Sequence, residues 1–553
     1  MRVAVIGGGL AGITAALALA EAGEDVTLLE AKPRLGGATM SFERGHLVVD
    51  TGQHVFLRCC TAYRGLLDRL GMTSSAPIQP RFDVTILTPP TSPRTNQLTQ
   101  PTSPRTTSPR TTGLTPSRPT TPGSTRRRRT RLRRRRLPAP LHLLPTLAGY
   151  PLISLSERAR VGQAVLAMRK VDPGAEATDQ VSFGDWLARH GQDERTRRAL
   201  WDLFSVASIN VPGDDASLAL AAKVVQTGLL ADAGAADIGV PALPLGEIHG
   251  TTAARKLAEH HATVQLSTKV TAIDVRDDID AGEAINAGEA MAASNGAGAS
   301  GTGDAAARYI VRLGRGAAED VPADAVVLAV PHETAARLIP PGALPAETVA
   351  GWAGLGAAPI VNVHVIYDRK VMDVPFAAGV DSPVQWVFDR TRISGMHARG
   401  EVGQYLAISL SAADEYVDRS VASLREEFIP ALADLLPAAG EATVTEFFVT
   451  RERRATFRGL PGTARLRPAA ATGLPGLVLA GSWTATGWPD TMEGAVRSGL
   501  NAVMALRAGA GAVAGVTRAA ATGTAGASAA VINVSKVNDS AVNTADSARG
   551  VRS

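Results

Sequence analysis

The class of fold is set by one run near the start of the chain, Val3-Ala4-Val5-Ile6-Gly7-Gly8-Gly9-Leu10-Ala11-Gly12. An apolar segment of strand length leads directly into clustered glycines, and an Ala-rich helical pattern follows. Gly7 permits a tight turn, Gly9 lets the backbone approach a pyrophosphate, and Gly12 lets helix and strand pack closely. The helix start at Leu10 and Ala11 offers free N–H groups to phosphates. We therefore predict a strand, turn and helix that bind a dinucleotide.

A second apolar strand ends at Glu30, 18 residues after Gly12. A carboxylate at this place is expected to bind ribose hydroxyls. The residues that follow, Glu30-Ala31-Lys32-Pro33-Arg34-Leu35-Gly36-Gly37, resemble the second phosphate-side motif of flavoproteins with two dinucleotide-binding domains. The resemblance implies FAD rather than NAD and places Ala31, Arg34, Gly36 and Gly37 at the cofactor. Ala38 departs from that motif, which usually has a basic residue after the glycines.

A second motif lies near the C-terminus, Leu479-Ala480-Gly481-Ser482-Trp483-Thr484-Ala485-Thr486-Gly487-Trp488-Pro489-Asp490-Thr491-Met492-Glu493-Gly494-Ala495-Val496. It resembles the flavin-closing motif of the amine oxidase superfamily. A strand is expected to end at Gly481, and a helix to begin near Met492 with its N–H donors aimed at the flavin. The predicted cofactor contacts here are Gly481, Ser482, Thr491 and Met492. Trp483 and Trp488 are interpreted as cavity walls.

A third motif narrows the resemblance, Asp50-Thr51-Gly52-Gln53-His54-Val55-Phe56-Leu57-Arg58-Cys59-Cys60-Thr61. It resembles a segment of plant-type phytoene desaturases and, more closely, of the FAD enzymes called hydroxysqualene dehydroxylases. From this resemblance we expect Gly52, Gln53 and Val270 at the cofactor. His54 and Asp50 are the candidate catalytic residues, because their segment should lie beside the flavin ring.

The resemblance implies an activity as well as a fold. Reduced FAD would deliver a hydride to the carbinol carbon of hydroxysqualene, with loss of water, and give squalene for hopanoid synthesis. This chemistry needs an apolar tunnel for a long isoprenoid substrate and a proton or hydrogen bond for the departing hydroxide. His54 and Asp50 are candidates for that assistance.

Two related enzyme classes remain as alternatives. A carotenoid desaturase also needs FAD and a long hydrocarbon channel. A flavin amine oxidase is less favoured, because Thr491 stands where many amine oxidases have an aromatic residue before Met-Glu-Gly. No cysteine lies in the C-terminal half, so non-covalent FAD is expected.

The fold class predicted from these motifs is α/β, with a Rossmann-like FAD-binding domain and a discontinuous α+β substrate domain. Three segments, 1–80, 243–335 and 470–508, are expected to form the FAD-binding domain. The two segments between them, 81–242 and 336–469, are expected to form the substrate domain, and 509–553 a tail. Two low-complexity segments within this order, 88–136 and 509–553, are expected to be disordered, and a third, 278–306, is interpreted as a distended hairpin loop.

The charge of the chain is uneven. The net charge is +5, but residues 88–136 hold thirteen Arg and no Asp, Glu or Lys, so the rest carries 5 − 13 = −8. The run 126–136, with nine Arg, could bind an anionic membrane or nucleic acid. We interpret it as a solvated insert with possible peripheral membrane contact, and expect no nucleic-acid partner.

The two cysteines are adjacent, Cys59 and Cys60, and adjacent residues rarely form a disulfide. We expect no metal site, and a reducing cytoplasmic location with no membrane-spanning helix.

Overall fold

The computed structural model describes residues 1–90, 128–276, 307–314, 319–400 and 402–521. The chain divides into two units, Met1–Leu506 and Arg507–Ser553. All strands described below belong to the first unit. Among the described residues, no helix is long and apolar enough to cross a membrane.

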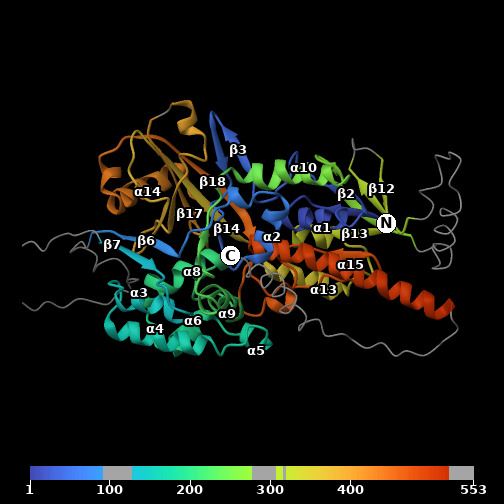
Figure 1. Ribbon diagram of the computed structural model, residues 1–553, viewed down its shortest axis with the longest axis horizontal. Helices are drawn as coiled ribbons and strands as arrows, with labels where there is room; N and C mark the ends of the chain where they lie inside the picture. The colour runs from blue at the N-terminus through green and yellow to red at the C-terminus, as the bar shows by residue number, and fades with distance from the viewer. Residues whose placement is uncertain (91–127, 277–306, 315–318, 401, 522–553) are drawn as a thin grey trace, which may run out of the picture. The chain divides into compact units, whose positions relative to one another are not determined.

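A five-stranded parallel sheet joins the start, the middle and the end of the first unit (Figure 1). Its strand order is β19 (Leu477–Leu479), β13 (Ala325–Leu328), β1 (Arg2–Ile6), β2 (Asp25–Leu29) and β9 (Thr263–Gln265). The central strand β1 pairs in register with β2 and β13, Val3 lying opposite Val26 and Ala325. This sheet confirms the predicted α/β class with a Rossmann-like core. The predicted domain boundaries stay a prediction.

The two faces of this sheet are covered by different elements. Side chains alternate along β1: Val3 and Val5 pack into one apolar cluster and Ala4 and Ile6 into another. The first cluster contains residues of α1 (Leu10–Ala20), α2 (Thr61–Arg69), α10 (Thr252–Glu259) and α15 (Met492–Ala521). The second contains residues of the sheet β10 (Val270–Val275), β11 (Tyr309–Leu313) and β12 (Val321–Ala323), and of α12 (His332–Leu338).

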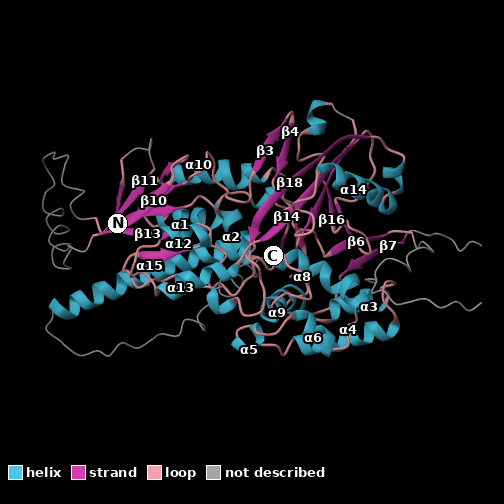
Figure 2. Cartoon of the chain, turned by 180° about the vertical axis from the view of Figure 1, so that it is seen from behind, coloured by secondary structure: helices cyan, strands magenta, loops and turns pink. Residues whose placement is uncertain are grey.

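A seven-stranded sheet carries the rest of the first unit. Its order is β18 (Val444–Thr456), β14 (Ala358–Tyr367), β17 (Gln404–Leu410), β16 (Trp386–Asp389), β15 (Phe376–Gly379), β6 (Asp83–Thr88) and β7 (Arg128–Arg133). Helix α14 (Val421–Leu435) packs on one face. A helical group lies on the other side (Figures 1 and 2): α3 (Leu144–Ala148), α4 (Leu155–Met168), α5 (Glu176–Asp179), α6 (Phe183–Arg189), α7 (Glu194–Thr196), α8 (Asp202–Ile209) and α9 (Leu218–Val225).

Smaller elements complete the unit. They are the antiparallel pair β3 (Ser41–Arg44) and β4 (Leu47–Asp50), the pair β5 (Phe56–Leu57) and β8 (Ile238–Gly239), and helix α13 (Ala346–Gly351). Strands β10 and β11 pair antiparallel, as expected for a hairpin around residues 278–306. Those residues lie outside the described ranges of the chain.

Two predictions of disorder are partly wrong. Within 88–136, residues Arg128–Arg133 form β7, an edge strand antiparallel to β6. Successive side chains of a strand point to opposite faces of the sheet. Leu132 is therefore buried, while Arg131 and Arg133 on the other face form ion pairs with Asp83. Residues 91–127 lie outside the described ranges.

The predicted tail also begins too early. Helix α15 continues to Ala521, where disorder from 509 was expected. The alanines of this stretch have the highest helix propensity, which explains how the helix extends through it. Residues 522–553 lie outside the described ranges.

Candidate functional site

The turn between β1 and α1 is built from glycines with different tasks. Gly7 has φ of +108°, and a Cβ there would lie 2.3 Å from the carbonyl oxygen of Ala329. A Cβ on Gly12 would lie 1.8 Å from the carbonyl oxygen of Gly7, so the fold itself requires both glycines. The nearest atom to a Cβ on Gly9 would be Cα of Gly37, at 4.0 Å. Gly9 therefore borders the open space that a pyrophosphate needs.

Helix α1 presents an uncapped N-terminus at this turn. No side chain caps it, and the first helical hydrogen bond runs from Ile13 N to the carbonyl of Gly9 at 2.9 Å. The N–H groups of Leu10 and Ala11 are thus left without intrahelical acceptors, at the positive end of the helix dipole. Such an end favours a phosphate group.

Glu30 connects the glycine turn with the segment that follows β2. Its buried carboxylate accepts hydrogen bonds from Gly8 N (2.6 Å, Oε2) and Lys32 N (2.7 Å, Oε1). Each oxygen keeps a further lone pair, which a ribose hydroxyl could use. Gly36 N donates to the carbonyl of Gly8 at 2.8 Å, so the segment 34–37 closes over the turn.

The neighbours of Glu30 occupy different surroundings. Ala31 is exposed beside it, and the Arg34 guanidinium contacts the sulfur of Met40, with Nε at 2.7 Å. Val270 begins β10, two residues after Thr268, whose N–H bonds to the carbonyl of Glu30 at 2.8 Å. Of the predicted cofactor residues, Ala31 and Val270 therefore lie close to Glu30, whereas the Arg34 guanidinium is turned toward Met40.

The C-terminal motif reaches the same edge of the parallel sheet. Gly481 follows β19 with φ of +135°, and its N–H donates to Ser498 Oγ at 2.8 Å. Gly7, Glu30 and Gly481 thus all follow carboxyl ends of parallel strands, where open α/β sheets bind their ligands. Thr491 Oγ1 accepts from Gly494 N at 3.2 Å, at the start of α15, whose first residue is Met492.

A buried arginine holds the loop after Gly481. Arg467 donates to the carbonyl of Ser482 (2.9 Å), to that of Thr484 (2.7 Å) and to Thr486 Oγ1 (3.0 Å). Burial lowers the pKa of Arg467 to about 10, and Asp490 opposes this shift. The guanidinium remains charged at neutral pH and fixes the loop that carries Ser482.

The tryptophans of this motif are buried and held in place. Trp483 Nε1 donates to the carbonyl of Val330 at 2.9 Å, and its ring packs edge-on against Trp352. The ring of Trp488 lies under the guanidinium of Arg497 at 4.9 Å. Their interpretation as cavity walls stays a prediction.

Glu493 links the C-terminal motif to α2. Its buried carboxylate accepts from Ala62 N (3.1 Å) and Tyr63 N (2.8 Å) in the first turn of α2, and from Arg497 Nε (2.7 Å). This is an N-terminal cap supplied from 430 residues away in the sequence. The C-terminal motif is therefore anchored to α2, which begins at Thr61, directly after Cys59 and Cys60.

Asp50 is fully engaged by neighbouring groups. Its Oδ2 forms a buried ion pair with Arg390, and its Oδ1 accepts from Ser41 Oγ (2.5 Å) and Leu245 N (3.0 Å). These partners hold both oxygens of the carboxylate in place. This geometry favours a positioning role for Asp50.

His54 and Gln53 lie beside polar atoms that lack partners. The atoms Gln53 Oε1 and Asn362 Oδ1 are buried without a hydrogen-bond partner among the described residues. Nδ1 of His54 and of His249 likewise lacks a hydrogen bond of normal geometry, although each imidazole faces a backbone group, that of Gly52 and of Thr39 respectively. Buried polar atoms are normally paired, so unpaired ones in one region indicate a site for a ligand.

These unpaired atoms adjoin the glycine segment. A Cβ on Gly36 would lie 3.7 Å from Cβ of His249, and Thr51 Oγ1 donates to the carbonyl of Ala38 at 2.8 Å. Asn362 is fully buried on β14, and its Nδ2 donates to the carbonyl of Thr51 at 3.1 Å. The segment 50–54 is thus bracketed by the cofactor-side glycines and the seven-stranded sheet.

Both histidines of this region are neutral at pH 7. Burial lowers the pKa of His54. Burial also lowers the pKa of His249 to about 3, with a smaller contribution from His54, while its Nε2 bonds to Tyr63 Oη at 2.8 Å. Neutral imidazoles can donate from one nitrogen and accept at the other.

Four residues of this site were missed by the sequence reasoning: His249, Asn362, Arg390 and Arg467. Asn362 gave one local signal, since it is polar within the otherwise apolar run 360–363. The others belong to no motif, and their importance depends on contacts distant in sequence. The set that is present fits FAD: a glycine turn with open space, an acid at the second strand and unpaired polar atoms beyond them.

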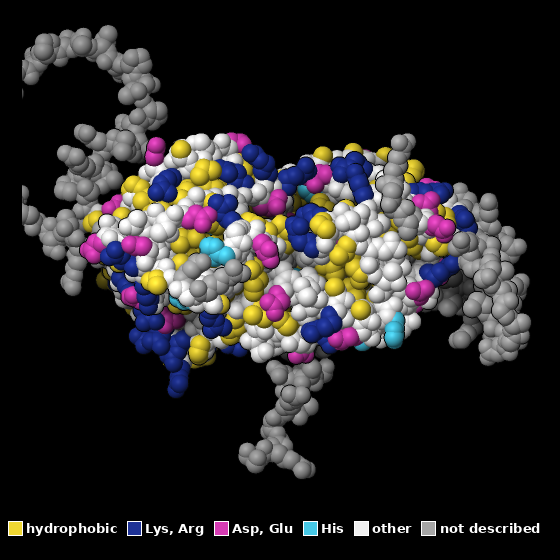
Figure 3. Space-filling model, turned by 90° about the horizontal axis from the view of Figure 1, so that it is seen from above, with side chains coloured by type: hydrophobic (Ala, Val, Ile, Leu, Met, Phe, Trp, Pro, Cys, Tyr) yellow, Lys and Arg dark blue, Asp and Glu magenta, His cyan; other side chains and the backbone are white. Residues whose placement is uncertain are grey.

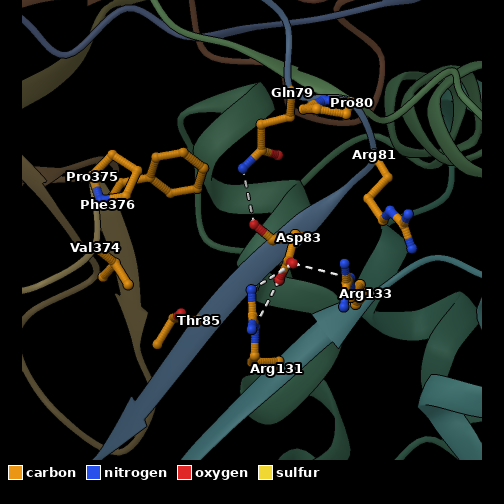
Figure 4. A pocket seen from close by; sticks show the side chains of 10 residues that line it. All are labelled: Gln79, Pro80, Arg81, Asp83, Thr85, Arg131, Arg133, Val374, Pro375 and Phe376. Carbon is orange, nitrogen blue, oxygen red and sulfur yellow. Dashed lines mark hydrogen bonds and ion pairs between the residues drawn. The ribbon is translucent and has the colours of Figure 1, made fainter.

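A pocket of about 330 Å³ lies elsewhere, at the edge of the seven-stranded sheet (Figure 4). Asp83 in its wall is held by Arg131 at 2.6 Å and Arg133 at 3.1 Å. None of the predicted cofactor or catalytic residues lines it. Its ion-paired wall gives no reason to place an apolar substrate there.

Cysteine and metal chemistry have little support at the site. Cys59 and Cys60 are free thiols, and hydrogen bonding between them lowers the pKa of Cys59 and raises that of Cys60. Among the residues described, no group of three or more His, Cys, Asp or Glu is arranged to hold a metal ion.

Relatives of this chain are found at the level of sequence and of fold. A hydroxysqualene dehydroxylase of Sinorhizobium fredii is 35% identical over 180 residues, 32% of this chain and 37% of that protein. The match therefore spans just over a third of that relative's length. A 15-cis-phytoene desaturase of an Oncidium hybrid cultivar is 22% identical over 512 residues, 90% of this chain and 76% of that protein.

The fold is shared with solved structures of amine oxidases. A double mutant of putrescine oxidase superposes with a TM-score of 0.61 at 18% identity, covering 92% of this chain and 99% of its own. A family model described as flavin containing amine oxidoreductase matches residues 10–507. Because this match covers nearly all of the first unit, the protein belongs to the flavin containing amine oxidoreductases and is a flavin-dependent oxidoreductase.

Proposed function

We propose that the protein uses non-covalently bound FAD to act on a long isoprenoid, and that the reaction is reductive dehydroxylation of hydroxysqualene to squalene, a step toward hopanoids. The similarity to hydroxysqualene dehydroxylase supports this substrate. The observation that carries the proposal is the group of unpaired buried polar atoms on Gln53, His54, His249 and Asn362, beside the glycine turn. An isoprenoid with a single hydroxyl needs few polar partners, and these are few and well buried.

The cofactor would be held by residues that the sequence singled out. The turn at Gly9 with the N–H groups of Leu10 and Ala11 would hold the pyrophosphate, and Glu30 the ribose. The segments 34–37 and 52–53, with Val270 and the residues around Gly481 and Met492, complete the proposed set. When bound and reduced, FAD supplies the hydride that replaces the hydroxyl on carbon.

The residues of this chain would act on the oxygen that leaves. His54, neutral because of its burial, is proposed to donate a hydrogen bond to the substrate hydroxyl as the C–O bond breaks. Asn362 Oδ1, which lacks a partner, would accept the hydrogen of that hydroxyl and orient it. Asp50 holds Arg390 and the strand end before the Gly52–His54 segment, and so acts as a positioning residue. The departing oxygen would take up one proton from solvent and leave as water, so that the hydride and the proton together replace the C–O bond by a C–H and an O–H bond.

A carotenoid desaturase is the second candidate, favoured by one observation. The phytoene desaturase relative aligns with 90% of this chain, whereas the dehydroxylase match covers 32%. Desaturation removes a hydride and a proton from adjacent carbons and involves no hydroxyl. The polar atoms near His54 would then have no substrate partner, which is why we place this function second.

Amine oxidation has weaker support. The likeness to putrescine oxidase is at 18% identity and shows the fold alone. Trp488, the aromatic residue just before Pro489, is buried and covered by Arg497 and Lys223. It is therefore not free to form a cage around an amine.

One anaerobic experiment separates the candidates. The FAD-loaded protein is reduced, mixed with hydroxysqualene, and followed by flavin absorbance and hydrocarbon analysis. We expect flavin reoxidation and stoichiometric squalene. In the parallel reaction, oxidised enzyme is mixed with phytoene. Reoxidation without squalene, or flavin reduction by phytoene with a desaturated product, would contradict the proposal.

A further inference from the structure

One surface feature takes no part in the site, the segment that leads from β7 into α3. The Thr146 hydroxyl donates to the carbonyl of Arg133, and Arg135 N donates to the carbonyl of His142 at 2.8 Å. These bonds fold residues 133–148 into one connected loop and helix at the edge of the seven-stranded sheet. Its arginines and leucines therefore lie close together on the surface.

The leucines of this segment point in two directions. Leu143 and Leu147 pack against the apolar core of the helical group. Leu137, Leu141 and Leu144 are instead exposed, at 41%, 46% and 48%. Single exposed leucines are common on protein surfaces, but three within eight residues form a group that calls for an apolar partner.

The arginines of this segment also fall into two classes. Arg131 and Arg133 are paired with Asp83, and Arg134 with Asp237 at 2.6 Å. Arg135 and Arg136 are exposed, and no ion pair joins them to a carboxylate among the described residues. Figure 3 shows basic and acidic side chains mixed over much of one face of the molecule, with one group of basic side chains at its lower left.

We propose that Arg135, Arg136, Leu137, Leu141 and Leu144 form a docking surface for an anionic lipid bilayer. The exposed leucines would enter the boundary between headgroups and acyl chains, while the arginines next to them contact phosphate groups. Nucleic acid fits less well, because it offers no partner for the leucines. The proposed docking surface is inferred from these exposed side chains and does not depend on the proposed reaction. An isoprenoid substrate would, however, dissolve in such a bilayer.

The test is vesicle sedimentation of the full-length, FAD-loaded protein. The vesicles consist of phosphatidylcholine alone or with 30% phosphatidylglycerol, at about 0.05 and 0.5 M salt. Two variants are compared with wild type: Leu137→Ser/Leu141→Ser/Leu144→Ser and Arg135→Glu/Arg136→Glu. Matched controls are Leu266→Ser, at a residue 40% exposed in the parallel-sheet region, and Arg195→Glu/Arg392→Glu, at exposed arginines elsewhere.

We expect wild type to bind the anionic vesicles and to be weakened by salt. A basic residue near an anionic surface contributes about fivefold in binding, so the double arginine variant should bind at least about 25-fold more weakly. The triple leucine variant should lose most binding at both salt concentrations, and the controls should match wild type. Flavin absorbance and unfolding midpoints check that the variants are folded. Absence of wild-type binding, or unchanged binding by the leucine variant, overturns the proposal.

Discussion

The cap that Glu493 supplies to α2 gives the sharpest stability prediction. Its carboxylate binds two backbone N–H groups of the first turn of α2, on Ala62 and Tyr63, and the side chain of Arg497. Glu493→Ala removes these acceptors and leaves the buried N–H of Tyr63 and the partly buried N–H of Ala62 without a partner. Glu493→Gln keeps the shape and one oxygen but removes the charge.

The magnitude follows from the number of bonds lost. A buried donor left unpaired costs about 1–3 kcal/mol. Two donors set an upper range of about 2–6 kcal/mol for Glu493→Ala, and the partial exposure of Ala62 N places the expected loss in its lower half. Glu493→Gln keeps one acceptor and should lose about half as much. Because α2 is the helix that is capped, hydrogen exchange of its amides should accelerate, with that of α14 unchanged.

The assay is urea unfolding combined with hydrogen exchange read by mass spectrometry. Glu446→Gln is the matched control, because Glu446 forms a half-exposed ion pair with Arg44 of the kind that contributes about 0–1 kcal/mol. Wild-type protection of α2 in Glu493→Ala would refute the reasoning that this residue joins the two ends of the chain.

Three further predictions concern the polar interior. Arg390→Met leaves the buried Asp50 carboxylate without its ion-pair partner and should lower the free energy of unfolding in urea by about 3–5 kcal/mol. The double variant Asp50→Asn/Arg390→Met should regain most of this loss. If it does not, the loss in Arg390→Met does not come from the broken ion pair. Burial lowers the pKa of His249 and of His364 to about 3. Their contribution to the free energy of unfolding is therefore fully present above pH 6.5 and is lost as the pH falls toward 3, by about 1.4 kcal/mol per pH unit for each histidine. An unfolding midpoint in urea that is equal at pH 7.5 and 5.0 would contradict this. Asn362→Leu removes the oxygen proposed to orient the substrate hydroxyl. The variant should retain FAD, measured by absorbance, but its kcat on hydroxysqualene should fall by about 10–100-fold. An unchanged kcat would show that Asn362 does not contact the substrate hydroxyl.

Much of the parallel sheet could be predicted from the sequence, because its signals are local. The glycine turn lies between a strand and a helix, and the strands near Glu30 and Gly481 are short apolar runs with clear ends. Residues 360–367 are rich in β-branched side chains, which favour a strand, and they lie in β14. Each of these features depends on residues close in the sequence.

The features that escaped prediction depend on distant partners or on unusual composition. The run of arginines indicated a segment without secondary structure. An edge strand, however, buries only every second side chain, and charged residues are common on its other face. Leu132 is the buried side chain here, and Asp83 on the neighbouring strand pairs with Arg131. The unpaired atoms of Asn362 and His249 become visible only when the chain is folded, since lack of a partner is a property of the whole environment. For the same reason, Asp50 could be placed by its motif but its pairing with Arg390 could not.

If the turn at Gly9 holds the cofactor as proposed, Gly9→Ala should lose FAD and keep its fold. Gly9 has an ordinary φ of −77°, and a Cβ there meets no protein atom closer than 4.0 Å, so the fold should tolerate the methyl group. The methyl group would project into the space that the pyrophosphate needs. The measurement is FAD content and unfolding midpoint after gel filtration, with Gly65→Ala as the control for a glycine in open surroundings. We expect a folded protein without FAD for Gly9→Ala and a yellow protein for Gly65→Ala. A folded Gly9→Ala protein that binds FAD as tightly as wild type would contradict it.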